Sequence, residues 1–299
     1  MPRTSGTPAT SKSRSSKPTA PSRPLLVIDG DSFTHRAYHA LPKSIRRAGK
    51  RPGNAIVGFA NTLIRLWQSE QPRAVIAGWD TLEAATYRHE ALESYQAGRE
   101  FDDELIEQLE LTPDFVAACG FANARAAGYE ADDFLAAAAK REEKRGGTVL
   151  VASGDRDSFQ LASDRVTILY PISGGGMARI TPAEVRERYG VEPRQVPDFI
   201  ALRGDPSDGI PGAKGVGAIG AANLLAHFAT LEDAFAAGRF AAQADTLRLY
   251  RKIATMDAKA PLPRVADMKP TWAKAAALAA EWGLNALAGR LEKLAEEGA

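Results

Sequence analysis

Three apolar runs that each end in an aspartate constrain most strongly what this chain can fold into. The runs span residues 25–29, 74–80 and 149–155. Short, continuous apolar runs of this kind are typical of buried strands in a parallel sheet. Parallel strands place their C-terminal ends on one edge, where ligands bind in open α/β sheets. We therefore expect Asp29, Asp80 and Asp155 to converge at that edge.

Six further acids belong to the same or later motifs. They are Asp157 in Ser-Gly-Asp-Arg-Asp, Glu130, Asp132 and Asp133 in Gly-Tyr-Glu-Ala-Asp-Asp, and Asp205 and Asp208 in Gly-Asp-Pro-Ser-Asp-Gly. Carboxylates that crowd together repel each other, which either raises their pKa values or favours a bound divalent cation. An all-oxygen donor set suits Mg²⁺ or Mn²⁺ better than zinc. The acids therefore predict a metal site.

Composition narrows the class of protein. The chain has 299 residues and 44% apolar content, enough for one large core or two modest ones. Its single cysteine, Cys119, excludes a disulfide framework within the chain and argues against a cysteine-based zinc site. No apolar run approaches the ~20 residues of a membrane span, and the N-terminus lacks the apolar core of a signal peptide. We expect a cytoplasmic monomer with no membrane contact.

The first 24 residues form a basic segment rich in Ser, Thr and Pro, which predicts a disordered tail over residues 1–24. Such a tail is either a solvated, dispensable segment or a weak, non-specific arm for nucleic acid. The overall charge is only +1, so the case for nucleic-acid binding depends on local sites.

The remaining chain divides near residue 181. Residues 25–180 alternate strand runs with helical spacing, which predicts an α/β core with a mainly parallel sheet flanked by helices. Residues 121–125 and 166–170 indicate two more strands. Thr181-Pro-Ala-Glu184 carries the capping signals of a helix start, and the pattern after it is all-helical. A smaller helical subdomain is expected over residues 181–299.

The polar segment at residues 81–105 directly follows the aspartate that ends the second run. A segment in this position suits a lid or gate over the acidic edge. Its candidate substrate contacts are Arg88, His89, Tyr95, Gln96 and Arg99.

Residues 209–220 are rich in glycine and precede an apolar helical stretch. Gly215-Val216-Gly217 indicates the hairpin of a helix–hairpin–helix module at about residues 205–228. There the backbone N–H groups of a glycine turn, backed by a helix N-terminus, can grip a phosphate.

Two basic features lie nearer the N-terminus. His35 and Arg36 fall in the first turns after the first strand, where they are either a solvent-facing pair or a stacking ring beside a phosphate-pairing guanidinium. Residues 42–53 form a loop with five cations, which is either a plain surface loop or a contact for a phosphate backbone.

Taken in order, these motifs resemble the 5′–3′ exonuclease and flap endonuclease family, which includes the N-terminal domain of bacterial DNA polymerase I. The resemblance covers roughly residues 24–260. A polymerase or proofreading domain does not fit in 299 residues, so the chain resembles a stand-alone member. The resemblance implies two-metal phosphodiester hydrolysis. By resemblance, Asp29, Asp80, Glu130, Asp132 and Asp155 serve the first metal, Asp157, Asp205 and Asp208 serve the second, and Asp133 and Asp155 lie close to both.

The resemblance also implies DNA contacts. Arg36 and Arg99 match basic residues at the scissile phosphate, His35 stands where the family has a base-stacking tyrosine, and residues 81–105 match the arch that admits a free 5′ end. The implied reacting set is Arg36, Gln96, Arg99, Asp132 and Asp155, and the implied DNA-binding set is His35, Arg36, Arg88, Tyr95, Arg99, Gly212, Lys214, Gly215 and Gly217. The hairpin matches a duplex clamp assisted by a monovalent cation such as K⁺.

Two motifs depart from the family pattern. Gln96 replaces a lysine beside the scissile phosphate, which removes a charge that would stabilise the transition state. Ile219 and Gly220 replace a lysine and a threonine in the hairpin, which predicts a weaker grip on duplex DNA.

The function expected from the resemblance is a nuclease of DNA replication and repair that depends on two Mg²⁺ or Mn²⁺ ions. Its substrates would be 5′ flaps, nicked or gapped duplexes and free 5′ ends, with RNA-primer hybrids as a further class.

Three other functions compete with this expectation. Asp29-Gly-Asp31 is similar to the nucleophile motif of haloacid-dehalogenase-type phosphatases, although that function leaves the later acids unused. The changes at Gln96 and in the hairpin favour a structure-specific DNA-binding protein with weakened catalysis. A PIN-type ribonuclease shares the acidic core but does not need the arch or the hairpin.

Overall fold

The computed structural model describes residues 23–81, 85–97 and 101–298, so most of the predicted tail over residues 1–24, namely residues 1–22, lies outside the described residues. A six-stranded sheet forms its centre, in the order β5-β4-β1-β6-β7-β8. The strands are β1 Leu25–Asp29, β4 Ala74–Gly78, β5 Ala122–Ala124, β6 Val149–Ala152, β7 Val166–Pro171 and β8 Met177–Ile180. All neighbours are parallel except β7 and β8. The predicted mainly parallel sheet is confirmed, and β8 adds an antiparallel edge that the glycine-rich turn before it did not reveal.

Alternating side chains of the strands build two cores, one on each face of the sheet. Leu25 and Val27 of β1 face a core with α5 (Ala131–Lys144), whereas Leu26 and Ile28 face a core on the other side. The helices of that second core are α1 Gly30–Ala40, α2 Asn54–Glu70, α4 Asp103–Ala118, α11 Trp272–Glu281 and α12 Asn285–Glu297.

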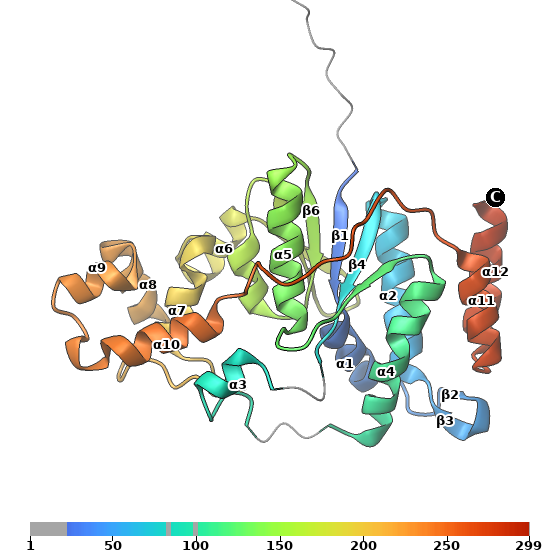
Figure 1. Cartoon of the computed structure of the whole chain (residues 1–299), viewed down its shortest axis with the longest axis horizontal. Coiled ribbons are helices and arrows are strands. Elements are labelled where there is room, and N and C mark those ends of the chain that lie inside the picture. The colour runs from blue at the N-terminus through green and yellow to red at the C-terminus, as the bar shows by residue number, and fades with distance from the viewer. Residues whose placement is uncertain (1–22, 82–84, 98–100, 299) are drawn as a thin grey trace, which may run out of the picture.

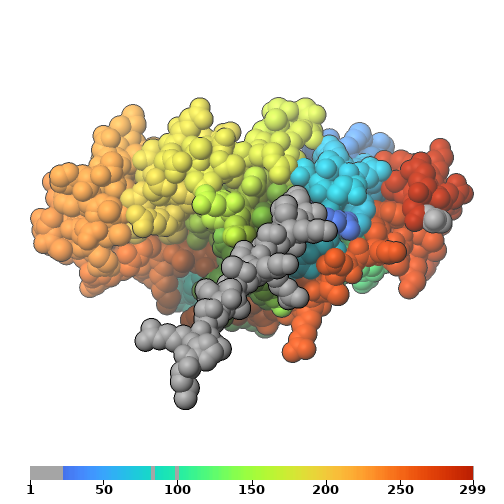
Figure 2. All heavy atoms as spheres, turned by 90° about the horizontal axis from the view of Figure 1, so that it is seen from above, coloured from blue at the N-terminus to red at the C-terminus, as the bar shows by residue number. Residues whose placement is uncertain are grey.

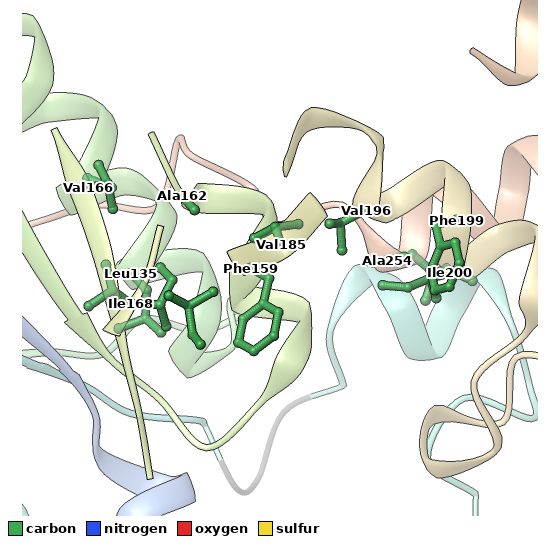
Figure 3. Packing of buried hydrophobic residues seen from close by; sticks show 14 of the residues in the cluster. Leu135, Phe159, Ala162, Val166, Ile168, Val185, Val196, Phe199, Ile200 and Ala254 are labelled. Atoms are coloured by element: carbon green, nitrogen blue, oxygen red, sulfur yellow. The ribbon is translucent and has the colours of Figure 1, made fainter. Parts of the chain in front are cut away.

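The first core continues without a break into a helical subdomain. Its helices are α6 Pro182–Tyr189, α7 Val196–Arg203, α8 Ala218–Phe228, α9 Leu231–Ala236 and α10 Ala244–Ala254. Figure 3 shows Phe159 and Val185 between the sheet-side residues Leu135 and Ile168 and the helical residues Val196, Phe199, Ile200 and Ala254. The sheet and the helical subdomain therefore share one hydrophobic core.

The last two helices depart from the predicted division at residue 181. That prediction assigned residues 181–299 to one subdomain, but α11 and α12 lie beside α4, at the opposite end of the molecule from α8 and α9 (Figures 1 and 2). Trp272 is the anchor: its ring lies 6.5 Å from that of Trp67 and 5.9 Å from that of Phe121. Burial of these aromatic rings explains why the chain returns to the α/β core.

The basic loop at residues 42–53 forms a small hairpin, β2 Arg46–Arg47 with β3 Arg51–Pro52, against α4. The cations of this loop form ion pairs with acids of α4 and with its N-cap residue. The pairs are Lys43 with Asp102 (3.0 Å), Arg46 with Glu104 (2.7 Å), Arg47 with Glu107, and Arg51 with Glu107 (3.4 Å). Four cations are thus partly neutralised within the chain, which disfavours a simple phosphate-binding loop.

None of the helices in the described parts of the chain is long and apolar enough to cross a membrane.

Candidate active site

A hollow of about 470 Å³ opens at the C-terminal edge of the parallel strands. Its lining is mainly acidic and comes from several separate segments of the chain. The lining residues are Asp29, Asp31, Ser32, His35, Asp80, Tyr95, Gln96, Phe101, Glu130, Ala131, Asp132, Gly154, Asp155, Ser207 and Asp208. The sheet edge thus brings together most of the predicted carboxylates, as expected from parallel strands.

The acids at the ends of β1 and β4 are held by short polar contacts. Asp29 caps α1, accepting hydrogen bonds from Ser32 N (2.9 Å) and Ser153 Oγ (2.8 Å). Asp80 Oδ1 accepts from Ala131 N (2.6 Å), and the backbone N–H of Asp80 donates to Asp31 Oδ2 (2.7 Å). The first helix therefore begins directly at the end of β1, with Asp29 as its N-cap.

Glu130 is fixed by the segment that follows β4. The hydroxyls of Thr86 and Tyr95 donate to its two carboxylate oxygens, at 2.7 and 2.8 Å. Burial, and next the neighbouring Glu130 charge, raise the pKa of Tyr95, so this phenol stays a donor. The carboxylate is consequently oriented at the hollow before any ligand binds.

The turn after β6 and the loop after α7 carry the second group of acids. Asp155 Oδ1 accepts from Asp157 N (2.9 Å), which fixes that turn. Asp205 receives hydrogen bonds from Ser207 N (2.9 Å) and Arg203 Nη2 (3.0 Å). These two loops lie close enough for Asp155, Asp205 and Asp208 to act on Asp157 electrostatically.

Burial is the largest cause of raised pKa values in this cluster, and neighbouring carboxylates add to it. Burial raises the pKa of Asp29 to about 7, with Asp80 and Asp155 contributing and hydrogen bonds opposing. The pKa values of Asp31, Asp132 and Asp157 are raised well above the usual range for the same two reasons. The hollow therefore concentrates more negative charge than its own cations neutralise.

The donor set fits a hard divalent cation in its chemistry. Oδ1 of Asp132 is buried and accepts no hydrogen bond within the described residues, and its nearest cation is the Arg88 guanidinium at 3.6 Å. This oxygen can therefore still accept a ligand. No three His, Cys, Asp or Glu side chains of the described residues lie close enough to hold an ion as they stand. Side-chain movement of the carboxylates is thus needed for coordination.

Three predicted substrate contacts lie at this hollow. Arg36 is exposed, and its side chain crosses Gly154 so closely that a Cβ there would be 2.9 Å from Arg36 Cδ. The His35 ring lies 4.9 Å from the ring of Phe101, and both line the hollow. Gln96 Nε2 donates to Asp208 Oδ1 (3.3 Å). Arg99 lies outside the described residues.

Arg88 and Asp133 are placed differently from their predicted roles. Both are buried, at 1% and 0% exposure, and the guanidinium of Arg88 donates to the two oxygens of Asp133 at 2.7 and 3.0 Å. Asp133 also accepts from the backbone N–H groups of Glu130 (3.1 Å) and Asp257 (2.6 Å). These contacts favour a structural role for Arg88 and Asp133. Tyr95 lines the hollow, but it is only 4% exposed and its hydroxyl donates to Glu130.

The glycines of the predicted hairpin divide into two kinds. Gly212 has φ 79° and lies against the backbone of Gly204, where a Cβ would come within 2.5 Å of the Gly204 nitrogen. Its role is close backbone packing. Lys214, Gly215 and Gly217 lie before the start of α8, and nothing lies within 4 Å of a Cβ built on either glycine. This open turn suits a phosphate.

Two residues of the hollow were missed as site residues from sequence. Asp31 stood out in the sequence as part of a phosphatase-like motif, yet it is buried and its carboxylate accepts a hydrogen bond from the backbone N–H of Asp80. Phe101 is an exposed ring in an otherwise polar segment, and that isolation was the available signal.

Known proteins resemble this chain over most of its length. A family model described as the 5′-3′ exonuclease N-terminal resolvase-like domain matches residues 24–190, and one described as the 5′-3′ exonuclease C-terminal SAM fold matches residues 191–275. DNA polymerase I of Mycobacterium tuberculosis (strain H37Rv) is 42% identical over 210 residues, which is 69% of this chain and 23% of the polymerase. A thermostable DNA polymerase I of Thermus thermophilus is 40% identical over 210 residues, 70% of this chain and 24% of that protein. The chain thus spans about a quarter of the length of these curated relatives.

A solved structure of the phage T5 5′-exonuclease with bound zinc has the same fold. Its TM-score is 0.66 at 20% sequence identity, and the match covers 91% of this chain and 99% of the phage protein.

Proposed function

Because this chain belongs to the 5′–3′ exonuclease and flap endonuclease family, we propose that it hydrolyses DNA phosphodiester bonds with two bound divalent metal ions. It would remove nucleotides from 5′ ends and cut at 5′ flaps. The observation that carries the proposal is the convergence of buried acids with raised pKa values from separate segments on one hollow. A haloacid-dehalogenase-type phosphatase needs neither the later acids nor the glycine hairpin.

The carboxylates would hold the two ions in two overlapping sets. Asp29, Asp80, Glu130, Asp132 and Asp155 would form the first set, and Asp155, Asp157, Asp205 and Asp208 the second. Bound Mg²⁺ or Mn²⁺ ions would supply an activated water and neutralise charge that develops on the scissile phosphate. We leave Asp133 out of both sets because its two carboxylate oxygens accept hydrogen bonds from Arg88.

The remaining residues of the hollow would position the DNA. Arg36 lies at its edge and would pair with the scissile phosphate. The rings of His35 and Phe101 would stack on the terminal base, and Gln96 would hydrogen-bond to the phosphate without adding charge. The open turn at Lys214, Gly215 and Gly217 would hold the duplex phosphate backbone, with a monovalent cation such as K⁺ assisting.

The finer assignments belong to the same proposal. The substrates would include nicked and gapped duplexes, free 5′ ends and RNA-primer hybrids, and the protein would act as a monomer. Residues 191–271 would form the duplex-binding part, while α11 and α12 stabilise the α/β core.

Cleavage of a 5′-labelled double-flap DNA in Mg²⁺ and in Mn²⁺ tests the proposal. We expect products near the flap junction that disappear in EDTA and in an Asp155→Asn/Asp157→Asn variant. Tight flap binding without product in either metal would contradict catalysis and leave a structure-specific DNA-binding protein, the function that Gln96 favours.

A further inference from the structure

A second hollow, of about 710 Å³, lies beside the short helix α3 (Tyr87–Ala91). It contains none of the residues assigned to the active site. Its lining residues are Tyr87, Gly128, Tyr129, Lys252, Thr255, Met256, Asp257 and Lys259. We call it the tyrosine–lysine hollow.

Buried charged residues connect this hollow to the active site. Arg88 pairs with Glu130 and Asp133, and Glu130 lines the acidic hollow. Tyr87 and Tyr129 adjoin Arg88 and Glu130 in sequence, and the backbone N–H of Asp257 donates to Asp133 (2.6 Å).

Both tyrosine rings are packed against other side chains of the fold. The Arg88 guanidinium carbon lies 4.8 Å from the centroid of the Tyr87 ring, and the Tyr87 hydroxyl donates to the carbonyl of Thr255 (3.2 Å). Tyr129 packs against Phe134 at a centroid distance of 6.1 Å. Rings fixed in this way present a surface for stacking at little entropic cost.

The charge of the hollow is positive at its rim. Lys252 and Lys259 are exposed, on α10 and on the loop that follows it. The one acid of the lining, Asp257, uses an oxygen to accept from the backbone N–H of Lys259 (2.9 Å). Aromatic rings beside lysines are an arrangement with which proteins bind single-stranded nucleic acid, because bases stack on the rings and phosphates contact the cations.

We propose that the tyrosine–lysine hollow binds the single-stranded 5′ portion of a flap after the strand has passed the active site. The inference deepens the proposed function and rests on it, because it supplies a place for the strand that the carboxylates have no means to hold. Tyr129 stacks on a base of the displaced strand, and Lys252 and Lys259 contact its phosphates.

Flap length is the variable that tests the proposal. Fluorescence anisotropy in EDTA, which prevents turnover, gives the dissociation constant for flaps of one nucleotide and of about fifteen nucleotides. We expect the wild-type protein to bind the long flap about tenfold more tightly than the short one, since single-strand contacts add to duplex contacts.

The Lys252→Gln/Lys259→Gln variant is expected to lose most of this gain. For the long flap, the slope of log Kd against log salt concentration should also decrease by about 1.4. This value corresponds to about 0.7 for each of the two lost phosphate contacts on a single strand. A Lys140→Gln/Lys144→Gln variant removes the same charge from exposed positions on α5 and should keep both the gain and the slope.

A Tyr129→Leu variant should reduce the gain about fivefold while leaving the salt slope unchanged, because it removes stacking and no charge. Full retention of the length-dependent gain in the lysine variant, or an equal loss in the α5 control, would overturn the proposal. These outcomes are independent of cleavage, so a protein that binds long flaps through this hollow but does not cut them would refute the proposed function alone.

Discussion

Replacement of Arg88 by methionine tests whether this arginine is a buried structural ion rather than a DNA contact. Arg88 is 1% exposed, makes two hydrogen bonds to Asp133 and donates a third to the carbonyl of Ile253 (3.0 Å). Methionine leaves the fully buried Asp133 without its counter-charge. Breaking one side of a buried ion pair typically costs about 3–5 kcal/mol, and the two backbone donors that remain on Asp133 place the expected loss near 3 kcal/mol.

Urea unfolding at pH 7 in EDTA measures this loss as a decrease in the free energy of unfolding. An Arg88→Met/Asp133→Asn double variant should lose clearly less than the sum of the single changes, with a coupling of roughly 2 kcal/mol, because asparagine removes the charge of Asp133, the carboxylate nearest to Arg88. An Arg248→Met variant is the matched control, since Arg248 makes a two-point pair with Glu232 at the surface. Its effect on unfolding should be much smaller.

A loss below about 1 kcal/mol for Arg88→Met, or strictly additive effects in the double variant, would refute the reasoning. Either result would mean that the guanidinium is hydrated in solution and free to meet a phosphate.

Three further predictions concern the acidic hollow. Burial raises the pKa of Asp29 from 3.8 to about 7, so the folded state holds a proton that the unfolded state releases. The free energy of unfolding of the metal-free protein should therefore fall by up to about 4 kcal/mol as the pH rises from about 4 to 7. Mg²⁺ should raise the Tm more at pH 8 than at pH 5.5. Differential scanning calorimetry checks this, and a larger Mg²⁺ effect at the acidic pH would contradict it. Gly154→Ala places a Cβ 2.7 Å from Ser32 Oγ and 2.9 Å from Arg36 Cδ, which should displace Arg36. We expect kcat for flap cleavage to fall about tenfold while the circular dichroism spectrum stays unchanged. An unaltered kcat would mean that Arg36 does not act at the site. Gln96→Lys adds a charge beside Asp208 and should raise kcat several-fold in single-turnover assays, and an unchanged rate would mean that position 96 does not reach the scissile phosphate.

The acids at the strand ends were predictable because a simple rule governs them. Asp29, Asp80 and Asp155 each follow an apolar strand, and parallel strands end on one edge. Helical geometry also distinguishes Asp132 from Asp133. Neighbouring residues on a helix point about 100° apart, and Asp133 occupies the third position of a capping box with Glu130. The prediction that both Asp132 and Asp133 are metal ligands did not take this constraint into account.

Arg88 and the last two helices could not be placed from local sequence. Arg88 lies in a polar segment that resembles any exposed loop, and its burial depends on α5 and α10, which approach it from distant parts of the chain. The docking of Trp272 beside Trp67 likewise depends on an aromatic partner far away in sequence. Long-range packing of this kind leaves no periodic signal.

The single core that runs from the sheet through Phe159 and Val185 into α7 bears on accuracy of cutting. Close packing of such a core resists sliding of the glycine turn before α8 relative to the carboxylates. Duplex DNA bound at that turn, as proposed above, would therefore reach the acids at one constant distance. The position of the cut along the strand would then be set by the protein's own dimensions.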